Sequence, residues 1–541
     1  MVRRESWLFC LPILLAVFIG YGTMHTASAS NNASDTSPPA VKAPRPSTIP
    51  KARLIVLTDM TSLEAGVREP DDAQSMIRLM LYANEFDIEG LIATSGLGHG
   101  QVARPEIIHA IVDAYGQCHP NLMQHAPGYP SAAQLRDTIK HGQPRADRDV
   151  PINQSLGHRK DTQASQWIIQ SVDKPDPRPV WIVIWGGSAD LAQALWTVRE
   201  TRSPAQVAEF VSRIRVVASN DQDSTGPWIK SQFPALFYIT RKRGARGMYH
   251  GGDRSLVGSP WVQKHIKGHG ALGRIYPDYR GGDVWSSRLG LVHGIKGGDS
   301  ATYMGLIRNG LNVRRLTWAN WGGRVEQDAD NPQHFHDAID RIAGYRTDIS
   351  PLIASVYRWR PDFQPEYAAR FDWCTTPYDQ ANHAPVNQHG IGVIHRQVRS
   401  GDLVSVHSGS WQDPDGHQLS YHWQTLPQER SYAGPLEITP TAEGASARFI
   451  APEVLHPRSI HMLLTVKDNG QPRLTAYKRI HVTVQPRHSD TELPAITDRS
   501  VAGWLAKSNA HRRVPRRSAQ PRITWIAPAD DAPVSRPPAS Q

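Results

Sequence analysis

The sequence predicts an α/β domain with an open, mostly parallel sheet flanked by helices, followed by a smaller all-β sandwich. In the first two thirds of the chain, short apolar runs alternate with helical patterns, which is typical of parallel βαβ units. Further on, the hydrophobic period changes to two, and Gly, Pro and Asp signals separate short strands. The 541 residues suffice for two or three domains with cores of their own.

The N-terminus has the pattern of a targeting segment. Two arginines precede an apolar stretch from Trp7 to Ile19, and small residues at 27–29 offer a cleavage site. We therefore expect a signal peptide at 1–29 and a Ser/Asn/Pro-rich linker at 30–50, with the mature protein exported to the periplasm or the extracellular space. No other stretch has the length and hydropathy needed to span a bilayer, so no membrane partner is expected after cleavage.

The net charge and the cysteines bear on two questions: whether nucleic acid is a partner, and whether the mature protein has a disulfide. The formal net charge of +10 comes in part from a basic, Pro-rich tail at 487–541, which we expect to be disordered. It is weak evidence for nucleic acid, and no specific nucleic-acid partner is expected. After removal of the leader, Cys118 and Cys374 remain. They either pair in an oxidising compartment or stay buried as thiols.

The α/β domain, expected at 51–377, begins with a strand–loop–helix–strand unit. Its first apolar run ends at Asp59, the helix begins at Asp71 and Asp72, and a second apolar run follows at 88–94. Ligands of parallel sheets bind outside the carboxyl ends of the strands, where these three carboxylates would meet. Converging carboxylates favour a hard divalent cation, calcium or magnesium. The alternative is that they only cap the helix and complement its dipole.

Two further strand ends carry polar loops. The buried strand at 180–185 runs into a tight turn at 186–189 that opens a helix, which is also the pattern of an ordinary Gly-rich turn. The strand at 214–218 is followed by a loop with Asp223 and Trp228. A carboxylate there fits hydrogen bonding to sugar hydroxyls, and an indole fits stacking on a sugar ring. The alternative is an Asx-turn loop with a packed tryptophan.

The last part of the α/β domain contributes a fourth acidic position. Residues 241–298 are rich in Gly, Arg and aromatic side chains, a composition typical of lids and binding loops. Asp299 then precedes a helical pattern that ends at Asn309, so spacing alone favours an N-cap role for this aspartate. A helical pattern rich in Tyr, Trp and Arg follows at 351–372.

The period-two region, expected as a domain at 378–486, contains five strand patterns. They lie at 403–406, 419–423, 447–450, 461–466 and 479–484. Short strands at this spacing, separated by Asp-Pro-Asp-Gly and Asp-Asn-Gly turns, predict an antiparallel β-sandwich of immunoglobulin-like type. The pair Asp413 and Asp415 could hold calcium, but a turn is the better interpretation of that spacing.

Several short motifs, taken in this order, resemble a known family. The acidic signature Thr58-Asp59 … Pro70-Asp71-Asp72 and the run at 92–98 resemble the calcium-dependent nucleoside hydrolases. A second set resembles secreted, cellulose-binding proteins that have a nucleoside-hydrolase-like domain and a C-terminal β module. These motifs are Trp185-Gly186-Gly187, Asp223–Trp228, Gly298-Asp299-Ser300, Asn309-Gly310-Leu311, Trp321-Gly322-Gly323 and Asp372-Trp373-Cys374. They are specific as a set, although no single one is.

The resemblance implies a nucleoside-hydrolase-like fold and calcium-dependent cleavage of N-glycosyl bonds. By position, the calcium ligands would be three carboxylates and one backbone carbonyl, from Asp59, Asp72, Asp299 and Ala189. Asp59 would also be the base that takes a proton from water. The residues that would contact substrate are Asp71, His99, Asp223 and Trp228. His99 stands where the family has a sugar-contacting Asn, although a lone loop histidine also occurs without such a role.

The chain departs from the nucleoside-hydrolase pattern at three points. Leu57 stands where those enzymes carry the first Asp of the signature, the loop at 60–69 is longer, and Gly298 stands where they carry a histidine that protonates the leaving group. His293 is a nearby histidine in the sequence. These changes point away from ordinary nucleosides as substrates.

Two functions follow from these patterns. The first is an exported calcium-dependent glycosidase that acts on a nucleoside-like N-glycosyl compound or a related glycosyl compound. The second is a non-catalytic protein in which the pocket and the β-sandwich hold a polysaccharide such as cellulose. The sixteen tryptophans suit the second function because indoles stack on sugar rings. The oligomeric state is left open by the sequence.

Overall fold

The computed structural model describes residues 49–63, 70–94, 102–144, 150–282, 291–312, 314–342, 351–429 and 431–487. The expected signal peptide, most of the expected linker, the basic tail from 488 onward and His99 lie outside these residues. Within them, no helix combines the length and the apolar character that crossing a membrane requires.

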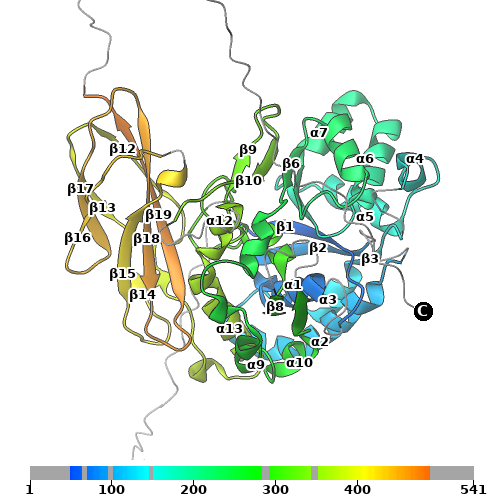
Figure 1. The fold of residues 1–541 in the computed structure, drawn as a ribbon, viewed down its shortest axis with the longest axis horizontal. Helices are drawn as coiled ribbons and strands as arrows, with labels where there is room; N and C mark the ends of the chain where they lie inside the picture. The colour runs from blue at the N-terminus through cyan, green and yellow to red at the C-terminus, as the bar shows by residue number, and fades with distance from the viewer. Residues whose placement is uncertain are drawn as a thin grey trace, which may run out of the picture. The chain divides into compact units, whose positions relative to one another are not determined.

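An eight-stranded sheet forms the centre of the α/β domain, with the strand order β3-β2-β1-β4-β5-β6-β10-β9 (Figure 1). All neighbouring strands in it are parallel except β10 and β9, as the alternation of strands and helices predicts. The strands are β1 Ala52–Thr58, β2 Phe86–Ala93, β3 Ile139–His141, β4 Val180–Ile184, β5 Ile214–Ala218, β6 Phe237–Thr240, β9 Val325–Gln327 and β10 His334–Asp337. The chain winds outward in one direction from β1 and in the other from β4. This switch point is where doubly wound sheets bind ligands.

Helices cover both faces of this sheet and enclose two separate cores (Figure 1). In β1, Leu54 and Val56 face the core that α1, α2 and α13 close, whereas Ile55 and Leu57 face the core that α5, α6 and α8 close. Because β1 is buried on both faces, its centre is a continuous apolar run. The helices are α1 Pro70–Leu81, α2 Pro105–His125, α3 Ala132–Asp137, α4 Ile152–Ser155, α5 Gln163–Asp173, α6 Ala189–Thr201, α7 Pro204–Ser212, α8 Thr225–Gln232, α9 Ser259–His265, α10 Gly270–Ile275, α11 Ala301–Met304, α12 Ala354–Tyr357 and α13 Arg360–Asp372.

The segment predicted as a long irregular lid is partly regular. It contains α9, α10 and an antiparallel pair, β7 (Tyr279–Gly282) with β8 (Leu291–Gly294). Pro260 stands in the first turn of α9, and Trp261 and Val262 pack into the core. Burial stabilises this helix, which at seven residues is too short to show a clear period in the sequence.

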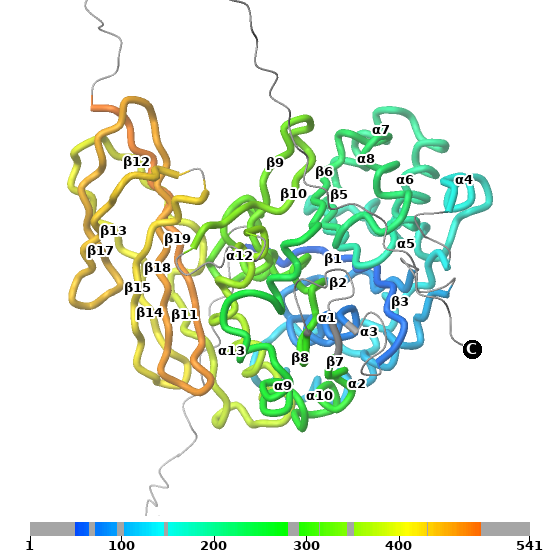
Figure 2. The backbone as a smooth tube through the Cα atoms, in the orientation of Figure 1, coloured from blue at the N-terminus to red at the C-terminus, as the bar shows by residue number. Residues whose placement is uncertain are grey.

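Two sheets that share one core form the C-terminal β-sandwich (Figure 2). One has the order β12-β19-β18-β15 and the other β13-β17-β16, and β11 pairs with β14. The strands are β11 Val386–Asn387, β12 Ile394–Arg399, β13 Leu403–His407, β14 Trp411–Gln412, β15 Ser420–Thr425, β16 Thr439–Pro440, β17 Ser446–Ile450, β18 Arg458–Lys467 and β19 Thr475–Gln485. All five predicted strands are present. The unpredicted β12 pairs with β19 in parallel, so the sandwich is not wholly antiparallel.

A buried ion pair of the sandwich is hydrogen-bonded to the backbone of the α/β domain. Arg479 on β19 is fully buried, and its Nη1 lies 2.5 Å from Oε2 of Glu429. Its Nε donates to the carbonyl oxygen of Leu311 at 2.6 Å, and Oε1 of Glu429 accepts the backbone N–H of Ala319 at 2.8 Å. Tyr477 of β19 belongs to the same apolar core as α1 and α13. The two domains therefore share a packed junction.

The two cysteines of the described residues are buried free thiols. A Cβ placed on Gly270 would lie 3.0 Å from both Cys118 Sγ and Cys374 Cβ, so the two residues are neighbours. The hydrogen bond with Cys374 lowers the pKa of the Cys118 thiol to about 6. Of the two states that the sequence allows, the structure has the thiols.

Candidate metal centre

The crevice at the switch point lies where β1 and β4 end. Asp59 follows β1 and is 3% exposed, and Gly186 lies two residues beyond β4. A Cβ on Gly186 would come within 2.6 Å of Asp59 Cγ, a distance at which atoms clash. The glycines after Trp185 therefore give the β4 turn the room to approach the end of β1.

Two side chains of α1 bring a distant segment to this crevice. Oε1 of Gln74 accepts the backbone N–H of Lys296 at 2.7 Å, and Oγ of Ser75 accepts the backbone N–H of Ser300 at 3.0 Å. Both α1 residues are buried, so losing either bond would leave a desolvated polar group. Ser75 and Ser300 are 225 residues apart in the sequence. Asp299, next to Ser300, is thereby fixed beside the start of α1.

Three carboxylates meet at this point. Asp71, Asp72 and Asp299 each place one oxygen within 4.8 Å of the other two. Asp72 and Asp299 are 2% and 5% exposed, and the Thr58 hydroxyl donates a hydrogen bond to Oδ1 of Asp72. A hard divalent cation prefers carboxylate oxygens that converge in this way. The residues present therefore fit the calcium that the sequence predicts, and the same donors fit magnesium.

A buried ammonium accompanies the carboxylates. Nζ of Lys296 lies 3.6 Å from Oδ1 of Asp71, and Lys296 is 1% exposed. Three carboxylates and one ammonium give these four side chains a formal charge of −2.

The carboxylates open onto a pocket of about 170 Å³ that both acidic and basic side chains line. We call Asp71, Asp72 and Asp299 the acidic wall. Arg241, Lys242 and Arg246, together with Tyr249 from the same segment, also line the pocket, and we call them the basic wall. A ligand in this pocket would therefore meet both acidic and basic side chains.

A carboxylate holds Arg241 of the basic wall in place. Its Nη2 lies 3.0 Å from Oδ1 of Asp337, and its Nη1 donates to the carbonyl oxygen of Gly323 at 3.1 Å. Burial lowers the pKa of Arg241, although Asp337 acts in the opposite direction. Lys242, by contrast, is exposed and lines the pocket.

The rim of the pocket contains a residue with unusual backbone geometry. Asn220, just beyond β5, has a φ of 70°, a left-handed conformation that asparagine tolerates better than most residues. Gln222 in the same loop donates from Nε2 to the carbonyl oxygen of Trp185 at the end of β4. The loop after β5 is thus tied to the switch point, and its strained residue lines the pocket.

Lys296, Arg246 and Tyr249 were not predicted as site residues. They come from the Gly- and Arg-rich segment predicted as a lid, in which no spacing singles out one basic residue. A Cβ on Gly298 would lie 3.5 Å from Cε1 of Tyr249, so the phenol stands beside the position where the resembled enzymes carry a histidine. His293 is exposed and lies outside the pocket lining.

Asp223, predicted to contact substrate, is not part of the pocket lining and is 2% exposed. Its carboxylate accepts the backbone N–H of Ser188 at 3.0 Å and the N–H and hydroxyl of Thr225 at 2.9 and 2.6 Å. Burial raises the pKa of Asp223, although these donors oppose the shift. The geometry ties the turn after β4 to the start of α8.

Trp228, also predicted to contact substrate, is a partly buried residue of α8. Its ring meets Phe233 edge to face at 5.8 Å between centroids, and the Arg199 guanidinium lies 5.4 Å from its centroid. It is not part of the pocket lining. A sugar-stacking role for Trp228 stays a prediction.

The predicted metal set and the observed cluster overlap in part. Asp72 and Asp299 belong to both, whereas the third carboxylate of the cluster is Asp71. Asp59 is buried against the β4 turn, and Ala189 is the fully buried first residue of α6. Metal-binding roles for Asp59 and Ala189 stay predictions.

A second acidic group lies in the β-sandwich. Asp413, Asp415 and His417 each place one possible ligand atom within 4.8 Å of the others. Oδ1 of Asp413 accepts the backbone N–H groups of Asp415 and His417, both at 3.0 Å. These bonds form the turn that the spacing predicts, and calcium binding at this pair stays a prediction.

Comparison with known proteins agrees with the fold. Residues 53–325 match a family described as "Cellulose-binding Sde182, nucleoside hydrolase-like domain", and residues 404–484 match "Cellulose-binding protein Sde0182, C-terminal domain". One solved structure is a nucleoside hydrolase-related hypothetical protein from Saccharophagus degradans, described as associated with carbohydrate metabolism. It is 32% identical, and the match covers 81% of this chain and 100% of that chain with a TM-score of 0.66.

Two other solved structures match short parts of the chain. A 2,6-sialyltransferase from Vibrionaceae Photobacterium sp. JT-ISH-224 is 11% identical over 18% of each chain, with a TM-score of 0.14. Mouse PcdhgC3 EC1-3 is 21% identical over 17% of this chain and 31% of that chain, with a TM-score of 0.13. Neither TM-score supports an argument about the fold. No curated protein matches the chain.

The match over 53–325 covers the βαβ unit, the acidic cluster and the turn after β4, and the Saccharophagus degradans protein is matched along its whole length. The chain therefore belongs to the family of cellulose-binding proteins with a nucleoside-hydrolase-like domain.

Proposed function

We propose that the chain is an exported, calcium-dependent hydrolase of N-glycosyl (nucleoside-like) or related glycosyl compounds, and that it also associates with a polysaccharide such as cellulose. The main support for hydrolase activity is that Asp71, Asp72 and Asp299 lie close together at the switch point of the sheet. The description of the family, and that of the Saccharophagus degradans protein, support carbohydrate association. Export agrees with a polysaccharide outside the cell and with the leader expected at 1–29.

The acidic wall would position water and sugar. Asp72 and Asp299 would hold the cation, with Asp59 and the Ala189 carbonyl as further ligands. Bound calcium orients a water and lowers its pKa. Asp59 would take the proton from the water as that water attacks the anomeric carbon. Asp71, whose charge Lys296 partly offsets, would accept hydrogen bonds from sugar hydroxyls.

The basic wall would receive the leaving group. Tyr249 stands beside Gly298, where the resembled enzymes carry a histidine, and its phenol would donate a hydrogen bond to the departing atom. Lys242 and Arg246 lie on the same wall and favour a group that departs with negative charge. The proposed substrate is thus a glycosyl compound with an acidic leaving group, such as an aryl riboside. Contacts from His99, Asp223 and Trp228 stay predictions.

Hydrolysis of p-nitrophenyl riboside tests the proposal. With calcium present, the full chain should release nitrophenolate faster than inosine is cleaved, and chelation should abolish the release until calcium is restored. Asp72→Asn and Asp299→Asn should each lower kcat/KM by about 100-fold or more, because a ligand to the cation is lost. The exposed Asp330→Asn is the matched control and should keep full activity. Circular dichroism checks that each variant is folded.

Two results would contradict the hydrolase. One is the absence of turnover across aryl ribosides and other aryl glycosides with calcium present. The other is turnover that chelation leaves unchanged, because the acidic wall would then have no metal to hold.

A non-catalytic carbohydrate-binding protein is the second candidate. Gly298 favours it, because it stands where the resembled hydrolases carry the leaving-group histidine. The buried Lys296 ammonium also favours it, because a positive charge beside Asp71 opposes the binding of a cation. In that case the full chain would sediment with insoluble cellulose, with or without chelator, and would hydrolyse no glycoside in the panel. If the full chain does not sediment with cellulose, the non-catalytic binding function is contradicted.

A further inference from the structure

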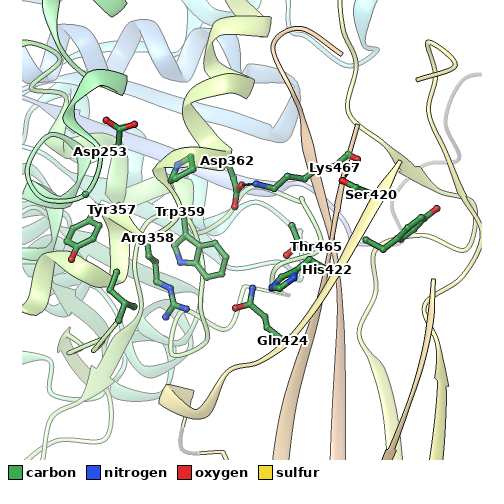
Figure 3. A pocket seen from close by; sticks show the side chains of 14 residues that line it. Asp253, Tyr357, Arg358, Trp359, Asp362, Ser420, His422, Gln424, Thr465 and Lys467 are labelled. Atoms are coloured by element: carbon green, nitrogen blue, oxygen red, sulfur yellow. Dashed lines mark hydrogen bonds and ion pairs between the residues drawn. The ribbon is translucent and has the colours of Figure 1, made fainter. Parts of the chain in front are cut away.

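A second and larger cavity lies between the α/β domain and the β-sandwich. Its volume is about 760 Å³, against about 170 Å³ for the pocket at the metal centre. Tyr357 and Trp359, where α12 passes into α13, line one side, and β15 and β18 line the other. We call this cavity the interdomain cleft (Figure 3). Its volume lies within the range of roughly 300–1,000 Å³ that is usual for ligand pockets, which often form between domains.

The register of β15 decides which side chains reach the cleft. Residues two apart in a strand share a face, so Ser420, His422 and Gln424 point to one side. Trp423 points to the other side, into the core of the sandwich. His422 lies opposite Thr465 of β18 in the register. Figure 3 shows His422, Gln424 and Thr465 on the sandwich side of the cleft, facing Trp359.

The cationic side chains of the cleft already have partners. Nζ of Lys467 lies 2.6 Å from Oδ1 of Asp362, whose Oδ2 accepts the Tyr477 hydroxyl at 2.6 Å. Nη1 of Arg358 lies 3.1 Å from Oδ2 of Asp340. A charged ligand would have to compete with these pairs. The cleft is therefore poorly suited to an anion such as a phosphate or a uronic acid.

The uncharged polar groups of the cleft, in contrast, have unused hydrogen-bonding capacity. Within the described residues, the side chains of His422, Gln424 and Thr465 make no hydrogen bond. Each of them can both donate and accept. An apolar ligand would bury these groups without partners, at a cost that sugar hydroxyls would avoid because they also donate and accept.

Two aromatic side chains of the cleft are held in fixed positions. Gly251 and Gly252 have φ values of 69° and 56°, and a Cβ on either would lie within 2.9 Å of the Tyr357 ring. The backbone can approach this ring only because both residues are glycine. Trp359 meets the Tyr477 ring edge to face at 5.9 Å, and the Arg358 guanidinium lies 5.1 Å from its centroid. Both aromatic residues are largely buried, at 7% and 4% exposed, so they form a fixed wall of the cleft and not a full stacking surface.

We propose that the interdomain cleft binds a segment of a neutral, hydroxyl-rich polysaccharide chain, of the glucan type. This inference rests on the carbohydrate association proposed above, and it assigns that association to His422, Gln424 and Thr465 rather than to the metal centre. A neutral sugar suits the cleft better than an ionic or an apolar ligand does, because the cations are paired and neutral donors and acceptors line the cleft.

Titration of the full chain with cellohexaose, by calorimetry, tests the assignment. The variant His422→Ala/Gln424→Ala removes two neutral side chains that make no bond within the described protein, so its melting temperature should match the wild type. Its affinity for cellohexaose should fall by about tenfold or more. The matched control is His456→Ala/Gln397→Ala, which removes the same residue types from exposed positions elsewhere on the sandwich and should bind like wild type. Asp72→Asn should also bind cellohexaose like wild type.

The outcomes separate this inference from the proposed function. If the wild type binds cellohexaose and the His422/Gln424 variant binds within twofold of it, the cleft assignment is wrong while carbohydrate association stands. If Asp72→Asn alone loses binding, the glucan occupies the metal centre and the assignment is again wrong. Preference for a sulfated glycan or for a peptide over cellohexaose would overturn the neutral-sugar chemistry. If the wild type binds no glucan, soluble or insoluble, both ideas fail.

Discussion

The metal centre and the interdomain cleft differ in how their charged side chains are arranged. In the metal centre, three carboxylates converge, and the Lys296 ammonium lies 3.6 Å from Asp71. In the cleft, Lys467 and Arg358 are each paired with a carboxylate, Asp253 accepts hydrogen bonds from Ser255, and the other polar side chains are neutral. Converging carboxylates suit a cation and the chemistry that it supports, whereas paired charges beside neutral groups suit adhesion to a neutral chain. We infer that the metal centre binds the cation and that the interdomain cleft binds the neutral chain.

Arg479→Met should have the largest effect on stability. Arg479 lies at the junction between the β-sandwich and the α/β domain, and its removal leaves Glu429 buried beside His461 without its main partner. The free energy of unfolding should fall by about 3–5 kcal/mol. Urea denaturation measures it, with the exposed Arg396→Met as the control. A loss under about 1 kcal/mol would show that the junction does not depend on this pair.

The same ion pair predicts a pH dependence that is smaller than the effect of the mutation. Burial alone would raise the pKa of Glu429, but Arg479 and His461 outweigh it and hold the pKa below its ordinary value of 4.5. A depressed carboxyl pKa stabilises the fold above the ordinary value, and this stabilisation is lost as the pH falls through and below 4.5. The melting temperature should therefore drop over that range, and less so in Glu429→Gln. Equal acid sensitivity in the two proteins would assign the drop to other carboxylates.

Lys296→Met should change ligand binding at the metal centre and not in the cleft, because it removes a positive charge beside Asp71. Calcium affinity, measured by calorimetry, should rise by about tenfold because a competing positive charge near Asp71 is removed. Cellohexaose affinity should stay unchanged. A fall in calcium affinity would mean that Lys296 positions Asp71 for the cation instead of competing with it.

Lys467→Met should have the smallest effect. The Lys467 side chain is 34% exposed, and Asp362 keeps the Tyr477 hydroxyl as a partner, so stability should fall by less than about 1 kcal/mol. The unpaired Asp362 would make the cleft acidic. Binding of a cationic glucosamine oligomer should then increase relative to cellohexaose. An unchanged ratio of the two affinities would show that charge balance in the cleft does not select the ligand.

The sequence singled out Asp71, Asp72 and Asp299, which lie close together in the structure, but none of the basic residues of the pocket. Asp71 and Asp72 follow a strand–helix pattern whose topology is regular, so the position of their carboxylates could be predicted. Asp299 came only from the family resemblance, because the bonds from Gln74 and Ser75 that hold its segment are tertiary contacts between distant residues. Lys296 and Tyr249 carry no spacing signal at all.

Other expectations depended on surroundings that the sequence does not display. Asp223 and Trp228 follow a strand end as binding residues often do, and their substrate contacts stay predictions; in the structure Asp223 is bonded to Ser188 and Thr225, and the Trp228 ring meets Phe233. The cleft could not be predicted, because it depends on how α12 and α13 meet β15. The strand itself was predicted, but the side of the sandwich that its His422 faces was not.

A crystal structure of the full chain grown in calcium tests the central claim most directly. The account predicts an ion at the switch point, bound by carboxylate oxygens of Asp72 and Asp299 at about 2.3–2.6 Å. Crystals in millimolar calcium that show no ion there, with the Lys296 ammonium lying between Asp71 and Asp72 instead, would contradict it.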